Sequence, residues 1–245
     1  MKYRRLNKWH FITPISLILF VAALFFIKSD PNFIVAIIIS VSLHEAAHGL
    51  LITMSGLKFN TFFVPFLGAG VIPSETSKYL SLSKLNRALI AIAGPFVNLI
   101  LFFVGLALVW YVPGYSIFGM QLANINLALV VINMTPFVIF DGFKIASTVI
   151  HSLNNIWLKV TASFYFSFFT FLGLFFLFQK NGSVTGKDLI WIISLYLVSA
   201  LALYIFSIFE SESKSMTKLE TLFILIMFTF TSSISMIWLY LTLFF

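Results

Sequence analysis

The chain has 245 residues, of which 60% are hydrophobic and 9% are charged, whereas soluble domains average about 25% charged residues. This composition predicts an integral membrane protein and excludes an ordinary soluble domain. The net charge of +7 does not indicate a nucleic-acid partner, because the basic residues separate apolar segments as they do in membrane-protein loops. The sequence contains no cysteine, which excludes thiolate metal sites and leaves His and carboxylate side chains as the strong ligands.

Seven apolar segments approach the length of about 20 residues that a helix needs to cross a bilayer. They are residues 11–27, 33–54, 88–111, 121–140, 157–178, 189–209 and 220–245. We therefore predict an all-α, multi-pass membrane protein with six or seven transmembrane helices, six if one C-terminal segment lies at the interface. The expected parts are a basic segment with the first helix (1–32), a core (33–150) and a set of C-terminal helices (151–245).

The basic residues also predict how the chain is oriented in the membrane. The first apolar segment follows a basic N-terminus, as in a signal peptide, but no small-residue cleavage site follows it, so we expect an uncleaved helix. With a cytoplasmic N-terminus, twelve of the 15 Lys and Arg residues fall on the inner side, and the other three are Lys28, Lys180 and Lys187. We therefore expect a cytoplasmic N-terminus and location in the plasma membrane.

The second segment contains the sequence HEAAH, formed by His44, Glu45 and His48 with two alanines between. Two imidazoles four residues apart lie on one face of a helix and can hold a zinc ion, and the Glu beside them is placed to act on water. Ionisable groups are costly at membrane depth and are usually functional there. The motif therefore predicts a metal centre ~9 Å from the cytoplasmic end of this helix. A proton pathway is the main alternative.

Residues 55–86 differ in composition from the segments on either side. Their glycines and prolines argue against a spanning helix, and the aromatic and β-branched residues between them predict short strands. We predict a short β-like, membrane-associated loop after the second helix. It either pairs with an extended substrate beside the metal centre or only packs there, and no feature of the sequence favours one over the other.

A catalytic zinc ion usually has three protein ligands, so a third is needed beside the two histidines. Among the eight carboxylates, position relative to the predicted spans leaves Glu75 and Asp141. Asp141 is the better candidate because it follows the apolar run 122–140, so its depth can approach that of His48. Pro136 breaks the helix before it, and Gly142 permits unusual backbone conformations after it. In the alternative interpretation, Asp141 caps the following helix, residues 143–153.

Three motifs resemble those of the site-2 protease family of intramembrane zinc metalloproteases (peptidase family M50). They are HEAAH, the GPxxN sequence of residues 94–98, and Asn133-x-x-Pro136 followed by Asp141-Gly142. The resemblance covers about residues 33–150 and makes this segment a metalloprotease core. It implies zinc binding by His44, His48 and Asp141, catalysis by Glu45, and a place near the substrate for Asn133. The chain departs from the family pattern at Val138 and Phe143, where a second proline and a second glycine are common.

We therefore expect a zinc metalloendopeptidase with one Zn²⁺ per chain, which hydrolyses transmembrane or membrane-associated proteins or hydrophobic peptides near the cytoplasmic face. Asn133 and Asn98 are candidate substrate-binding residues. Alternatively, Asn133 satisfies the backbone broken at Pro136, and Gly94 with Pro95 only permits close helix packing. The competing functions are a transporter, which the absence of ionisable groups inside the later spans disfavours, and a catalytically silent binding or immunity protein, which the intact Glu45 disfavours.

Overall fold

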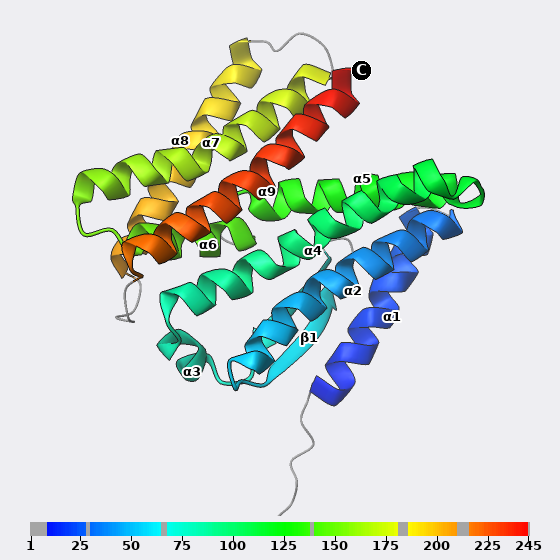
Figure 1. Ribbon diagram of the computed structural model, residues 1–245, viewed down its shortest axis with the longest axis horizontal. Coiled ribbons are helices and arrows are strands. Elements are labelled where there is room, and N and C mark those ends of the chain that lie inside the picture. Colours follow the sequence, from blue (N-terminus) through cyan, green and yellow to red (C-terminus); the bar gives the residue numbers. More distant parts are fainter. Residues whose placement is uncertain are drawn as a thin grey trace, which may run out of the picture.

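The computed structural model describes residues 9–27, 30–64, 68–137, 140–180, 186–209 and 216–244. Its long helices are α1 (Trp9–Ile27), α2 (Pro31–Met54), α4 (Lys84–Tyr111), α5 (Ser116–Met134), α7 (Ile156–Lys180), α8 (Gly186–Phe209) and α9 (Lys218–Phe244) (Figure 1). The shorter elements are β1 (Phe59–Val64), β2 (Gly68–Pro73), α3 (Thr76–Ser81), η1 (Pro113–Tyr115) and α6 (Asp141–His151). Each predicted apolar segment carries a long helix, so the all-α multi-pass class with a β-like loop after the second helix is confirmed.

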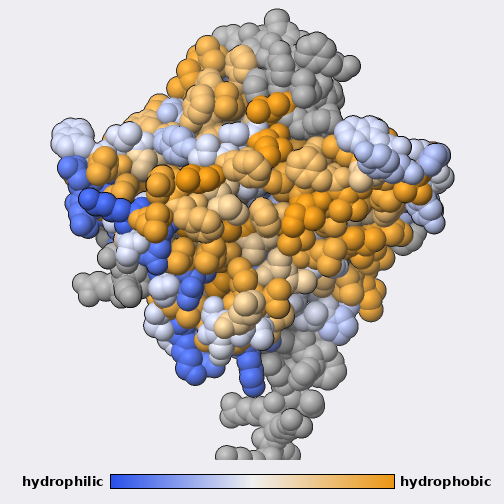
Figure 2. Space-filling model, in the orientation of Figure 1, coloured by the Kyte–Doolittle hydropathy of each residue, from blue (hydrophilic) through white to orange (hydrophobic). Residues whose placement is uncertain are grey.

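Five helical segments within the described residues are long and apolar enough to cross a membrane. They are Pro31–Met54, Lys84–Tyr111, Pro113–Met134, Asp188–Ile205 and Lys218–Ile237, while α1 and α7 contribute the shorter apolar stretches Thr13–Leu24 and Ile156–Phe169. Figure 2 shows hydrophobic side chains over the middle of the molecule and hydrophilic ones toward its margins. Soluble proteins rarely expose an apolar surface of this extent, so the chain is an integral membrane protein.

The predicted span 121–140 is wrong in its extent, because it is not one helix. α5 ends at Met134, and Asp141 begins the separate helix α6. Pro136 has no backbone N–H and disfavours helical geometry at the residue before it, and Thr135 accordingly has an extended backbone with φ −69° and ψ 129°. Phe140 occupies the N-cap position of α6, so Asp141 is its first helical residue and not its cap.

Helix α4 lies at the centre of the fold and packs against α2, α5, α6 and α9. Glycines let α4 and α5 approach closely: a Cβ added to Gly105 would lie 2.6 Å from the backbone nitrogen of Ala123, and one added to Gly119 would lie 2.7 Å from the carbonyl oxygen of Gly105. Helices in a bilayer associate through such close contacts, because lipid supplies no hydrophobic force between them. α4 therefore has a fixed position beside α2, which carries the HEAAH motif (Figure 1).

Strands β1 and β2 form the predicted β-like loop as an antiparallel pair, with Phe62 opposite Gly70. Helix α1 covers the outer edge of β1. The Thr13 hydroxyl donates to the carbonyl of Thr61, and the Phe63 N–H donates to the Ser16 hydroxyl at 3.0 Å. Side chains of α1 therefore satisfy polar groups on one edge of the pair, and the outer edge of β2 lies on the other side.

The C-terminal helices pack onto the core. α9 contacts α4 and α5, and α8 contacts α6 and α7. The Ser199 hydroxyl on α8 donates to the carbonyl of Pro136 at 3.2 Å and accepts from Ser167 on α7 at 3.1 Å, in buried surroundings. The C-terminal helices thus stabilise the interruption between α5 and α6, which precedes Asp141. Of the two departures from the family pattern, Val138 lies outside the described residues. The boundary at residue 150 stays a prediction.

Candidate metal centre

Helix α2 positions both histidines of the HEAAH motif. The helix begins where the Asp30 side chain accepts from the Asn32 N–H at 3.0 Å, with Pro31 at the first helical position, and both features favour a helix start. The helical spacing brings the two imidazoles onto one face. His44, Glu45 and His48 are all buried within the molecule.

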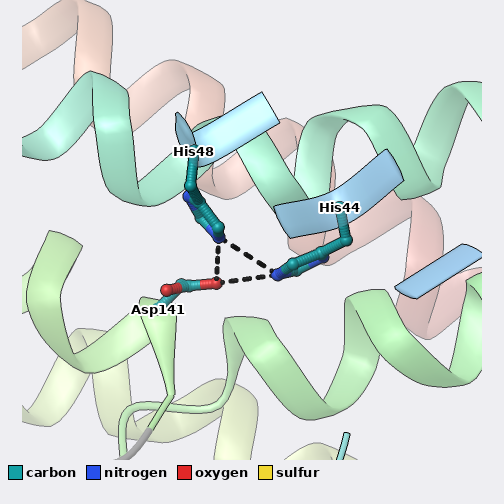
Figure 3. Close-up of side chains that lie close together, drawn as sticks. All are labelled: His44, His48 and Asp141. Atoms are coloured by element: carbon teal, nitrogen blue, oxygen red, sulfur yellow. Dashed lines mark hydrogen bonds and ion pairs between the residues drawn. The ribbon is translucent and has the colours of Figure 1, made fainter. Parts of the chain in front are cut away.

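Asp141 meets both imidazoles from the start of α6 (Figure 3). Its Oδ2 lies 3.2 Å from Nε2 of His44 and 3.1 Å from Nε2 of His48, and the two Nε2 atoms are 3.1 Å apart. Within the part of the chain that is described, this is the group of His and acidic side chains whose ligand atoms cluster tightly enough to hold one metal ion. The third ligand predicted from the sequence therefore lies beside the first two, although 93 residues separate it from His48.

The other candidate, Glu75, lies elsewhere. Its carboxylate is about half exposed and forms an ion pair with Lys78 at 2.6 Å. Glu75 is also absent from the described residues that line the cavity at the metal centre. The choice of Asp141 over Glu75 therefore agrees with the geometry.

Helix α4 supplies a hydrogen-bond acceptor to the Nδ1 atom of each imidazole. Nδ1 of His48 lies 2.6 Å from the carbonyl oxygen of Ile90, and Nδ1 of His44 lies 3.0 Å from Oδ1 of Asn98. Both partners are acceptors, so both Nδ1 atoms carry a hydrogen and both Nε2 atoms present lone pairs. Between these contacts, a Cβ added to Gly94 would lie 2.4 Å and 2.5 Å from the two Nε2 atoms. Glycine is therefore the residue that leaves room for the imidazoles at this point.

These donors fit a zinc ion. Two imidazole lone pairs and a carboxylate oxygen converge, and three acceptors at this separation repel one another unless a cation lies between them. Tetrahedral donors at ~2.0–2.1 Å from zinc lie ~3.3 Å apart, which is close to the distances in this cluster. Three protein ligands leave one position open, as in catalytic zinc sites.

Lys144, which no sequence motif marks, forms an ion pair with the Asp141 carboxylate. Its Nζ lies 2.9 Å from Oδ1 of Asp141, one turn along α6. This ammonium group stabilises the charged form of the Asp141 carboxyl, which burial alone would disfavour. The i, i+3 spacing on a helix is a signal by which Lys144 could have been found from sequence.

A cavity of about 860 Å³ opens beside the cluster. Glu45 and Asn133 line it together with Lys144, Arg87 and residues 69–73 of the hairpin. Asn133 also donates from Nδ2 to the carbonyl of Leu129 on its own helix at 3.0 Å, so part of its amide satisfies the backbone. Asn98 is absent from the described lining and contacts His44 instead. The two asparagines thus lie in different places relative to the cavity.

Apolar helices surround a buried cluster of two His side chains and a carboxylate, with a glutamate on the adjoining cavity, and this arrangement is that of a candidate zinc site in a membrane protein. The family model described as peptidase family M50 matches residues 32–123. These two findings agree on the part of the chain that carries HEAAH and the GPxxN sequence.

Two relatives carry a zinc metalloprotease name. The candidate zinc metalloprotease sll0528 of Synechocystis sp. is 32% identical in an alignment that covers 47% of this chain and 30% of that protein. The candidate zinc metalloprotease YwhC of Bacillus subtilis is 25% identical over 59% of this chain and 80% of that protein. The solved structure of the site-2 protease from Methanocaldococcus jannaschii is 22% identical, covers 83% of this chain and 93% of its own, and gives a TM-score of 0.41. The family model and the two relatives confirm the predicted resemblance to the site-2 protease family, peptidase family M50.

Proposed function

We propose that the protein is an intramembrane zinc metalloendopeptidase that cleaves transmembrane or membrane-associated proteins or peptides near the cytoplasmic face. The observation that carries this proposal is the convergence of His44, His48 and Asp141 beside a cavity that Glu45 also lines. All four side chains are buried among helices of a membrane protein, where ionisable groups are costly and usually functional.

Each residue has a separate role in the proposed reaction. His44, His48 and Asp141 would hold the zinc ion. When bound, zinc supplies a Lewis acid, which makes water acidic enough to ionise near neutral pH and polarises a carbonyl group. Glu45 accepts a proton from the attacking water and delivers it to the leaving amine. Asn133, which lines the cavity, hydrogen-bonds the substrate backbone.

The substrate must be extended at the cleaved bond, because helical amides are shielded by their own hydrogen bonds and side chains. The hairpin offers an edge for such a chain. In an antiparallel pair, the N–H and C=O of one residue point to the same side. Thr61 and Phe63 direct theirs toward α1, so their partners Val71 and Ala69 direct theirs to the outer edge of β2. β2 borders the cavity at the metal centre, and we assign the pairing of substrate to its outer edge.

The orientation and the membrane belong to the same proposal. With a cytoplasmic N-terminus, the C-terminal end of α2, the hairpin and α3 lie on the cytoplasmic side. Lys58, Lys78 and Lys84 flank this region, as expected for an inner face. Substrate would then reach the metal centre from the cytoplasmic half of the plasma membrane.

Replacement of Glu45 by Gln tests the proposal. Glu45→Gln keeps the ligands, so the purified protein should retain one zinc ion per chain, while cells that carry it should accumulate uncut substrates in their membrane proteome. Glu75→Gln is the matched control, because it removes an exposed carboxylate away from the cavity. Wild-type protein without stoichiometric zinc or another transition metal would overturn the proposal. If the wild-type protein binds zinc but the membrane proteomes of wild-type and Glu45→Gln cells do not differ, the protein is catalytically silent.

A further inference from the structure

We propose that Asn98 is a positioning residue that holds His44 in the tautomer able to bind the metal, an inference that rests on the zinc site proposed above. The two side chains meet in the interior between α2 and α4, with Oδ1 of Asn98 3.0 Å from Nδ1 of His44. Asn98 is 0% exposed. Within the described residues its Nδ2 has no hydrogen-bond partner. The hydrogen bond with His44 is therefore the interaction that compensates the burial of this amide.

The direction of this hydrogen bond decides which nitrogen of His44 can act as a ligand. A neutral imidazole carries one N–H, and only the other nitrogen has a free lone pair. The amide oxygen of Asn98 accepts a hydrogen and therefore selects the form protonated at Nδ1. Nε2, which faces His48 and Asp141, is then free to bind a cation. Such partners of ligating histidines set both the ring orientation and the metal affinity.

His48 also has a hydrogen-bond acceptor at its Nδ1 atom, but this acceptor is a main-chain oxygen. Its Nδ1 donates to the carbonyl oxygen of Ile90, a main-chain group that a change of side chain does not remove. Ile90, Gly94 and Asn98 follow one another at intervals of four residues and so share one face of α4. One stripe of α4 thus supplies an acceptor for each imidazole and, at Gly94, the space between them. Asn98 is the only one of the three whose contribution depends on a side-chain polar group.

This role differs from the substrate-binding role expected from the sequence. A substrate-binding residue borders the cavity, as Asn133 does, whereas Asn98 is absent from the described cavity lining and fully buried. Loss of a substrate contact would raise KM and leave zinc affinity unchanged. Loss of a positioning residue would weaken zinc binding even in protein that is never given a substrate.

Replacement of Asn98 by Leu and by Asp separates these roles. Leu removes the acceptor at similar volume, and we expect zinc affinity, measured on purified full-length protein by competition with a chelator, to fall by about 10–100-fold. Asp restores an acceptor of similar shape and should bind zinc at least as tightly as the wild type, because carboxylate partners increase the basicity of a ligating histidine. The Asp variant also keeps the test decisive if the Leu variant fails to fold.

Asn126→Leu is the matched control. Asn126 is also 0% exposed and also bonds to α2, with Nδ2 2.7 Å from the Ser40 hydroxyl, but it does not contact the histidines. We expect it to lower thermal stability as Asn98→Leu does, without changing zinc affinity. Unchanged zinc affinity in Asn98→Leu, or an equal loss in Asn98→Asp, would overturn this inference. It would leave the proposed function intact, because the Glu45→Gln experiment tests that function separately.

Discussion

Lys144 binds one oxygen of Asp141, and the two histidines face the other. The distance from Lys144 Nζ to Oδ1 is 2.9 Å, while Oδ2 lies 3.1 Å and 3.2 Å from the Nε2 atoms. The ion pair with Lys144, on the same helix, thus restrains the orientation of the carboxylate. α6 is only 11 residues long, so this short helix, rather than a spanning one, provides both the ligand and its support.

Replacement of Lys144 by Met should loosen this arrangement. The Asp141 carboxylate would lose its partner at Oδ1 and could rotate away from the imidazoles, so we expect roughly tenfold weaker zinc binding. The expected loss is at the lower end of the usual range because the Lys144 side chain is about half exposed and water partly replaces it. Chelator competition measures the effect. Lys78→Met is the control, since Lys78 forms an i, i+3 pair with Glu75 away from the site; equal zinc affinity in both variants would contradict the role of Lys144.

Replacement of Gly94 by Ala should strongly weaken zinc binding. The new methyl group would lie within 2.5 Å of both Nε2 atoms. The Nδ1 atoms of the two rings are hydrogen-bonded to Ile90 and Asn98, so the rings cannot move aside without losing these hydrogen bonds. We expect at least a 100-fold loss of zinc affinity. The helix itself should not weaken, because alanine favours a helix over glycine by about 1 kcal/mol.

Gly114→Ala is the control for this variant, since an added Cβ there meets no atom within 4 Å. Zinc content by mass spectrometry and thermal unfolding in detergent give the two readouts. A Gly94→Ala protein that retains a full complement of zinc would show that α4 does not limit the space at the histidines.

The outer edge of β2, for which the described part of the chain provides no backbone partner, makes a prediction about substrate binding. Val71→Pro removes an N–H that the pairing with β1 does not use, and proline is tolerated on such an edge. We expect at least a tenfold lower rate of cleavage at unchanged zinc content, because an added strand loses a main-chain hydrogen bond. Val71→Ala loses the side chain but keeps the N–H, and it should retain most activity. Equal losses in the two variants would point to side-chain packing instead of strand pairing. The assay uses a substrate identified from the Glu45→Gln membrane proteome.

The contact between Ser199 and Pro136 predicts a stability effect from the C-terminal helices. Ser199→Ala removes the buried hydrogen bonds to the Pro136 carbonyl and from the Ser167 hydroxyl, so we expect the free energy of unfolding to fall by about 1–3 kcal/mol. Ser163→Ala is the control, because among the described residues this buried hydroxyl bonds to the Lys159 carbonyl on its own helix and to no other helix. Thermal or denaturant unfolding in detergent measures the difference. Identical transitions for the two variants would mean that α8 does not stabilise the loop before Asp141.

Much of the metal centre could be predicted because its signals are local. The spacing of His44 and His48 places both rings on one face of a helix, whatever that helix packs against. The break at Pro136 follows equally from a missing N–H and a restricted neighbour. The choice of Asp141 also required a comparison of where each carboxylate lies relative to the predicted spans. The predicted span 121–140 was too long because composition locates an apolar stretch but not the end of a helix.

The partners of these residues depend on packing between distant segments. Asn98 contacts His44 across 54 positions, and sequence reasoning could name it only as a candidate for substrate binding, a role that stays a prediction. Which edge of the hairpin is already bonded likewise depends on α1, whose Thr13 and Ser16 bond to β1.

The sequence by itself thus determined the class of protein and the residues that can bind zinc, since composition, helical periodicity and proline geometry act within a few residues along the chain. The tertiary structure decided how α4 is rotated and placed against α2. That placement follows from close contacts at glycines and from buried hydrogen bonds between helices. Such contacts join residues far apart in sequence and leave no periodic signal in it. For this reason Glu45 and the candidate zinc ligands could be named from the sequence, whereas the contacts of Gly94 and Asn98 with the histidines required the fold.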